Sequence, residues 1–86
     1  MPEISKFYGI RVEMFFRDHN PPHFHAKYAE FKAEFDIRTL EIIRGWLPNK
    51  ARMLVIEWAI AHRNELMANW HLARENRTLN NIDPLE

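Results

Sequence analysis

The chain has 86 residues, with 12 basic and 12 acidic side chains and no cysteine. This length suits one domain, and the lack of cysteine excludes a disulfide-stabilised fold and a thiolate metal site. The balanced charge does not indicate general nucleic-acid binding, although a local basic patch stays open as an alternative. No apolar stretch reaches the ~18 residues of a membrane helix and the N-terminus does not look like a signal peptide, so we expect a cytoplasmic protein with no membrane contact.

Alternating apolar and polar residues predict half-buried strands in the first half of the chain. Two consecutive prolines interrupt the alternation and predict a loop between the first two strands. Short connections favour an antiparallel meander with one face exposed to water. The expected strands are residues 10–17, 23–28, 31–38 and a shorter one at 40–44.

From residue 48 onward the apolar residues recur at spacings of three and four, which predicts an amphipathic helix. The expected helix covers residues 48–75, or two helices broken near Arg63, and residues 76–86 form a tail. We therefore expect an α+β domain, an antiparallel three- to four-stranded meander with the long helix, or the two helices, on one face. The predicted core consists of Ile10, Val12, Met14, Phe24, Ala26, Phe31, Ala33, Phe35 and Trp58.

Three of the five histidines fall within seven residues, around the two prolines. His23 and His25 are two residues apart on an expected strand, so both project from its exposed face. A two-residue hairpin turn after this strand would place His23 opposite Asp36 and His25 opposite Glu34. Opposed Cβ atoms lie about 5 Å apart, close enough for a hydrogen bond between imidazole and carboxylate. His19 is expected to fold back above this pair.

Imidazole binds transition metals and transfers protons near neutral pH, which leaves four interpretations of the histidines open. They could stabilise the hairpin, bind a divalent metal such as zinc, take part in catalysis on an anionic substrate, or recognise a partner or an anion. No cofactor is otherwise implied. The candidate metal ligands are His19, His23 and His25, and the candidate catalytic residues are these three with Glu34, Asp36 and Arg17.

Three segments of the chain are distinctive: Phe7-Tyr8-Gly9-Ile10, the motif Arg-Asp-His-Asn-Pro-Pro-His-Phe-His at residues 17–25, and Glu57-Trp58-Ala59. In these segments the chain resembles a bacterial family known as domain of unknown function 4160. The resemblance runs from Pro2 to about Leu85. It implies a small prokaryotic protein, often encoded beside another small protein in a gene arrangement similar to toxin–antitoxin pairs. It supplies no catalytic residues.

Two functions remain in competition. The first is a protein-interaction module in such a two-gene pair, which binds a small protein partner or a second copy of itself. This function is favoured because spare apolar residues widen the apolar surface of the helix beyond what one sheet face covers. These residues are Met53, Ile56, Ile60 and Met67. The second is a histidine-dependent hydrolase, with or without a metal, that acts on a phosphodiester through the His19, His23 and His25 face. The sequence favours the first, because it does not spell out a complete catalytic set.

Overall fold

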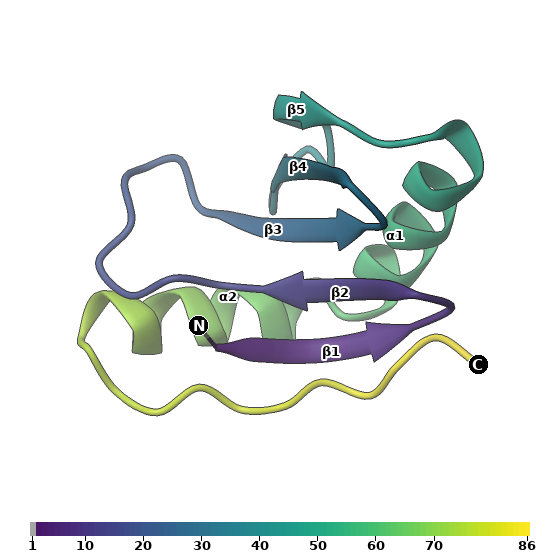
Figure 1. Cartoon of the computed structure of the whole chain (residues 1–86). Helices are drawn as coiled ribbons and strands as arrows, with labels where there is room; N and C mark the ends of the chain where they lie inside the picture. The colour runs from purple at the N-terminus through teal and green to yellow at the C-terminus, as the bar shows by residue number, and fades with distance from the viewer. Residues whose placement is uncertain (1) are drawn as a thin grey trace.

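The computed structural model describes residues 2–86, which form one antiparallel sheet followed by two helices. The strands pair in chain order, so the sheet is a simple meander. Both helices pack on the same face of the sheet (Figure 1), which confirms the α+β architecture. The elements are β1 (Glu3–Phe7), β2 (Ile10–Glu13), β3 (His23–Tyr28), β4 (Phe31–Asp36), β5 (Ile42–Trp46), α1 (Asn49–Ala61) and α2 (Arg63–Arg74).

The sheet has five strands, one more than the sequence predicted. The missed strand is β1, in which Ile4 and Ser5 are both buried because the register shifts between Glu3 and Ser5. This irregularity removes the period-two alternation by which strands are found in a sequence. The expected strand over residues 10–17 is also shorter than predicted. It ends at Glu13, and the chain then enters a loop in which Arg17 has a φ of 56°.

The later boundaries differ from the sequence prediction for local reasons. The expected strand at 40–44 lies at 42–46, because Leu40, with a φ of 61°, belongs to the turn that precedes it. The helical region is two helices, and the break comes at His62, whose backbone (φ −124°, ψ 23°) is not helical. The alternative of two helices broken near Arg63 is therefore the one observed.

The core lies between the covered face of the sheet and the helices. Phe24 and Phe35 stack with their ring centroids 5.3 Å apart, and Trp58 of α1 packs edge-on against Phe24 at 6.0 Å. Every residue of the predicted core is buried except Phe31. Phe31 is half-buried, because it lies at the outer end of β4, where its ring meets that of the exposed Trp46.

The tail after α2 returns along β1 (Figure 1) and is fixed by three contacts. The backbone N–H of Ile82 donates to the carbonyl of Ile4 at 2.8 Å, and the indole N–H of Trp58 donates to the carbonyl of Asp83 at 2.8 Å. The buried Asn69 exchanges two hydrogen bonds with the backbone of Asn80. Neither helix within residues 2–86 combines the length and the apolar character that a membrane span requires.

Candidate functional site

The loop between β2 and β3 returns Asp18 to the beginning of β3, beside the two strand histidines. Oxygen Oδ2 of Asp18 lies 3.0 Å from Nε2 of His23 and 3.3 Å from Nε2 of His25. Oxygen Oδ1 of Asp18 accepts a hydrogen bond of 2.9 Å from the backbone N–H of His19. One carboxylate therefore joins two of the three predicted histidines. We call Asp18, His23 and His25 the cluster.

The predicted register of the hairpin is confirmed, with His23 opposite Asp36 and His25 opposite Glu34. The side chains nevertheless contact diagonally, since Nε2 of His23 lies 3.6 Å from Oε1 of Glu34. Asp36 turns the other way and accepts hydrogen bonds of 2.7 and 3.2 Å from the backbone N–H groups two and three residues further on. Glu34 is thus a neighbour of the cluster, whereas Asp36 shapes the turn after β4.

Two predicted candidates, His19 and Arg17, are not members of the cluster. Their side chains are exposed on the outer side of the loop, where they border a depression together with Asp18, Asn20 and Arg74. Among residues 2–86, the group of side chains arranged to hold a metal includes Asp18 and not His19. The expected return of His19 above the pair is therefore not observed, because Asp18 occupies that position.

The surroundings of His23 determine which hydrogen bonds its ring can form. Its side chain is 6% exposed, and its ring lies 5.3 Å from that of Trp70 on α2. Nitrogen Nδ1 lies 2.7 Å from the carbonyl oxygen of Pro21, and Nε2 faces the carboxylate of Asp18. Both oxygens can only accept hydrogen bonds, yet a neutral imidazole has a single N–H. A neutral ring can therefore donate to only one of the two oxygens, and a metal ion beside Nε2 would satisfy the contact with Asp18.

The cluster has the dimensions of a metal site. Its two nitrogens and one oxygen all lie within 4.8 Å of one another. Ligand bonds of about 2.0–2.1 Å in a tetrahedral zinc site separate neighbouring ligand atoms by about 3.3 Å. The two distances from Asp18 Oδ2 to the histidine nitrogens, 3.0 and 3.3 Å, are close to this value. The hydrogen bond from His23 to Pro21 also fixes the ring in the way that outer-shell partners fix metal ligands.

The comparison with protein families decides where the chain belongs. Residues 9–71 match the family described as Domain of unknown function (DUF4160). The chain belongs to this family. The matched region begins at the end of the β1–β2 turn, ends in α2 and contains the whole cluster. No curated protein and no solved structure matches the chain.

The electrostatics of this DUF4160 domain keep Asp18 ionised. Burial raises the pKa of Asp18, whereas the hydrogen bonds from the backbone of His19 and from His25, and the charges of His23 and His25, lower it. The lowering effects prevail, so the pKa of Asp18 lies below its ordinary value. An ionised carboxylate at neutral pH is what a metal ligand must be.

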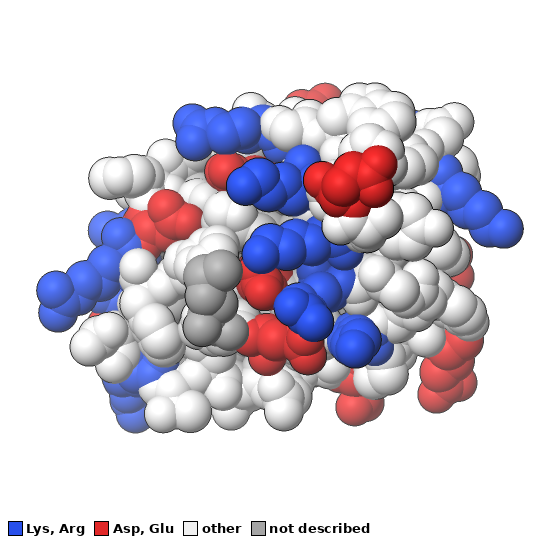
Figure 2. Space-filling view, viewed as in Figure 1, with Lys and Arg blue, Asp and Glu red and all other residues white. Residues whose placement is uncertain are grey.

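The DUF4160 domain also has a groove of about 320 Å³ beside the cluster, on the face of the sheet opposite the helices. We call this face the open face; it carries Arg11, Lys27, Lys32 and Arg44 together with the acidic Glu13 and Glu34. Figure 2 shows basic side chains gathered over the strands with acidic ones between them. The groove can hold an anionic group next to His25. It is lined by Phe15, His25, Lys27, Lys32, Ala33, Glu34, Arg44 and Gly45.

Proposed function

We propose that this DUF4160 protein binds a divalent metal ion at Asp18, His23 and His25 and hydrolyses a phosphodiester in the adjoining groove. The observation that supports the proposal is the pairing of His23, whose two ring nitrogens both face oxygens that can only accept. A neutral ring so placed can donate to only one of them. A metal ion held by Asp18, His23 and His25 would satisfy the other contact and would supply a Lewis acid beside the groove.

The groove supplies the remaining parts of such a reaction. A metal ion held by the two histidines and the carboxylate would polarise a phosphoryl oxygen and would lower the pKa of a bound water. Lys27, Lys32 and Arg44 surround the groove and would neutralise the phosphate. Glu34, 3.6 Å from Nε2 of His23, is placed to serve as a fourth ligand or to accept the proton of the attacking water.

Metal binding and hydrolysis are tested separately. Metal-free protein is titrated with zinc by calorimetry, and zinc-dependent hydrolysis of bis(p-nitrophenyl) phosphate is followed by the release of p-nitrophenolate. His25→Ala and Asp18→Asn should lose both, while His71→Ala, a control on the exposed side of α2, should keep both. His25 is preferred to the buried His23 because its loss threatens folding less.

The possible results separate the parts of the proposal. Equal zinc affinity in wild type and His25→Ala, or no zinc binding at all, contradicts the metal site. Zinc binding without hydrolysis leaves a metal-binding domain and refutes the hydrolase.

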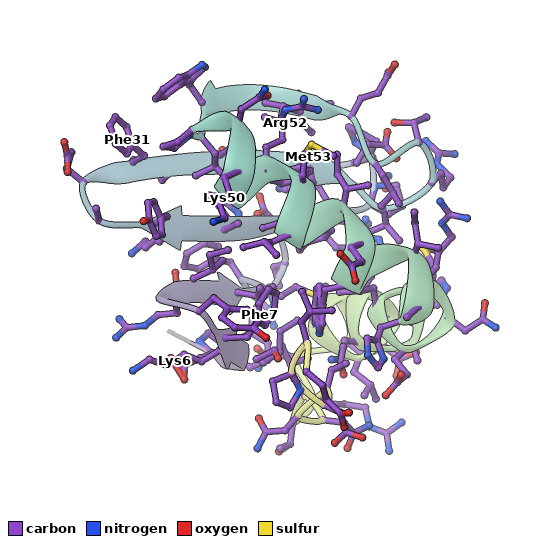
Figure 3. The ribbon with its side chains drawn as sticks, turned by 90° about the vertical axis from the view of Figure 1, so that its right-hand side faces the viewer. Lys6, Phe7, Phe31, Lys50, Arg52 and Met53 are labelled. Atoms are coloured by element: carbon purple, nitrogen blue, oxygen red, sulfur yellow. The ribbon has the colours of Figure 1, made fainter. Side chains whose placement is uncertain are left out.

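A second function, a protein-interaction module, is favoured by the outer face of α1. Met53 and Ile60 are each 61% exposed and border a groove of about 690 Å³ that is mostly apolar. Figure 3 shows Met53 beside Lys50 on the side of α1 that faces away from the sheet. Of the other spare apolar residues, Ile56 and Met67 are partly buried against the core. Exposed apolar surface of this kind marks contacts with other proteins.

We propose that this face binds the small protein encoded beside members of the family, or a second copy of the chain. Co-expression with the neighbouring gene, followed by affinity purification and light scattering, tests this. The double variant Met53→Glu, Ile60→Glu should lose the partner or the dimer while keeping zinc binding. A monomer that recovers no neighbour-encoded protein contradicts the interaction module.

A further inference from the structure

Four basic residues stand directly opposite one another across the open face. Lys6 of β1 is paired with Arg11 of β2, Arg11 with Lys27 of β3, and Lys27 with Lys32 of β4. We call these four residues the basic row. Like charges that are directly opposed destabilise a sheet. The stability of the fold therefore does not explain the basic row, whereas the binding of an anionic ligand would explain it.

Acidic side chains neutralise only part of the basic row. Nitrogen Nε of Arg11 lies 2.9 Å from Oε1 of Glu3, and Nζ of Lys27 lies 3.4 Å from Oε1 of Glu13. Within the described residues, neither Lys6 nor Lys32 forms an ion pair, and both side chains are exposed. Figure 3 shows Lys6 directed away from the helices, opposite to the neighbouring Phe7. The two unpaired lysines are free to meet a ligand from solvent.

An exposed indole continues the basic row at the next strand. Trp46 of β5 is the residue opposite Lys32, and it is 59% exposed. Its ring is supported from one side by Phe31, with centroids 5.0 Å apart and planes at 73°. Trp58 and Trp70 are buried in the core, so Trp46 is the tryptophan available for stacking. Exposed aromatic rings beside a line of cations are the elements of surfaces that bind single-stranded nucleic acid.

We propose that the basic row and Trp46 bind a short single-stranded nucleic acid, with phosphates along the row and one base stacked on the indole. The strand spacing of about 4.8 Å gives the row a length of about 14 Å. At a rise of about 3.4 Å for stacked nucleotides this accommodates about four. A duplex is excluded as the ligand, because its bases are already stacked and offer no face to Trp46.

This inference deepens the proposed function, on which it rests for its biological meaning, because it names the phosphodiester. Lys27 and Lys32 belong both to the basic row and to the groove beside His25, so a strand on the row reaches the cluster. Binding itself needs no metal ion. The two proposals can therefore fail independently.

The test is a binding titration in the presence of EDTA, which prevents metal-assisted hydrolysis. Fluorescein-labelled oligouridylate and oligothymidylate are titrated with protein at low salt, and anisotropy reports binding. Lys32→Glu should weaken binding about tenfold or more. Trp46→Ala should weaken it by roughly five- to hundredfold, the range of single base–aromatic stacking contacts. Lys50→Glu, the same charge change on α1, should bind like wild type.

Further readouts separate nucleic acid from other polyanions. Quenching of tryptophan fluorescence by the oligonucleotide should disappear in Trp46→Phe, and the log–log salt slope of about −2 to −3 should become shallower by about 0.7 in Lys32→Ala. A preference for the RNA or the DNA arm identifies the kind of strand.

The proposal is overturned if neither oligonucleotide binds, or if Lys32→Glu and Lys50→Glu bind the oligonucleotide with equal affinity. It is also overturned if polyglutamate displaces the oligonucleotide and Trp46→Ala binds it with unchanged affinity. Binding without hydrolysis supports this inference and counts against the hydrolase. Hydrolysis of the small ester without oligonucleotide binding leaves the proposed function and refutes the inference.

Discussion

Trp58 is the residue on which the attachment of the helices to the sheet most depends. Its side chain is fully buried, its ring contacts those of Phe7 and Phe24, and its indole N–H holds the tail at Asp83. It therefore joins α1, two strands and the C-terminal segment in one contact. Trp58→Ala should remove all of these contacts at once.

The expected cost follows from the burial of the ring. Truncation of a buried tryptophan to alanine costs about 3–5 kcal/mol. The lost hydrogen bond adds little, because Asp83 is exposed and water can replace the donor at its carbonyl. At about 0.05–0.15 kcal/mol per residue, the free energy of unfolding of a domain of this size is about 4–13 kcal/mol. Trp58→Ala should therefore leave the protein close to unfolding, whereas Trp58→Phe, which keeps most of the ring contacts, should cost about 1–2 kcal/mol.

The assay is urea denaturation followed by far-ultraviolet circular dichroism, since the substitutions change the fluorescent residues themselves. Trp46→Ala is the control, because that ring is 59% exposed and its loss should cost under about 1 kcal/mol. An unfolding midpoint for Trp58→Ala equal to that of Trp46→Ala would refute the packing of the helices on the sheet.

Three further predictions concern the loop, the edge strand and the tail. The pKa of Asp18 is lowered in the folded state. Its contribution to stability is therefore complete above the unfolded pKa of about 3.9 and is lost as the pH falls through the folded pKa. Asp18→Asn should flatten the acid dependence of the urea midpoint below about pH 4. Gly45 has a φ of 86° and a Cβ there would collide with the carbonyl oxygen of Lys32, so Gly45→Ala should cost about 2 kcal/mol or more in thermal denaturation. Gly9→Ala should cost clearly less, because φ is also positive at Gly9 but a Cβ there would meet only the ring of Tyr28, at an ordinary contact distance of 3.6 Å. The side chain of Asn69 is buried and both donates to and accepts from the backbone of the tail; Asn69→Asp should destabilise the domain more than Asn69→Ala, because it buries a charge and removes the donor, and unchanged urea midpoints would contradict this.

The covered face of the sheet and the pairing of β3 with β4 could be predicted because they depend on short-range rules. Phe24, Ala26, Ala33 and Phe35 alternate with polar residues, and a two-residue turn leaves one register that places all of them on the same face. The same register fixed the position of His25 opposite Glu34. Alternation and turn length are properties of the local sequence, so no knowledge of the rest of the chain was needed.

Asp18 was missed because no local rule places it. It lies in a loop without periodicity, and the loop must reverse before the carboxylate can meet rings five and seven residues later. His19 attracted attention instead, since its residue type suits metal binding, yet its side chain ends on the outer surface. The available signal was the chemistry of the motif itself. Asp18 lies close in sequence to His23 and His25, and a carboxylate is a natural hydrogen-bond partner for imidazole. Spacing alone could not distinguish residue 18 from residue 19.

The division of the sheet into two faces makes the functional proposals open to test. The covered face and Trp58 supply the burial that stabilises the fold, whereas the basic row stands on the open face and adds repulsion between like charges. Replacing Lys32 should therefore leave stability unchanged or raise it slightly, while it weakens the binding of an anion. A substitution that improves folding and impairs binding separates a functional residue from a structural one, because a purely structural role would move both in the same direction.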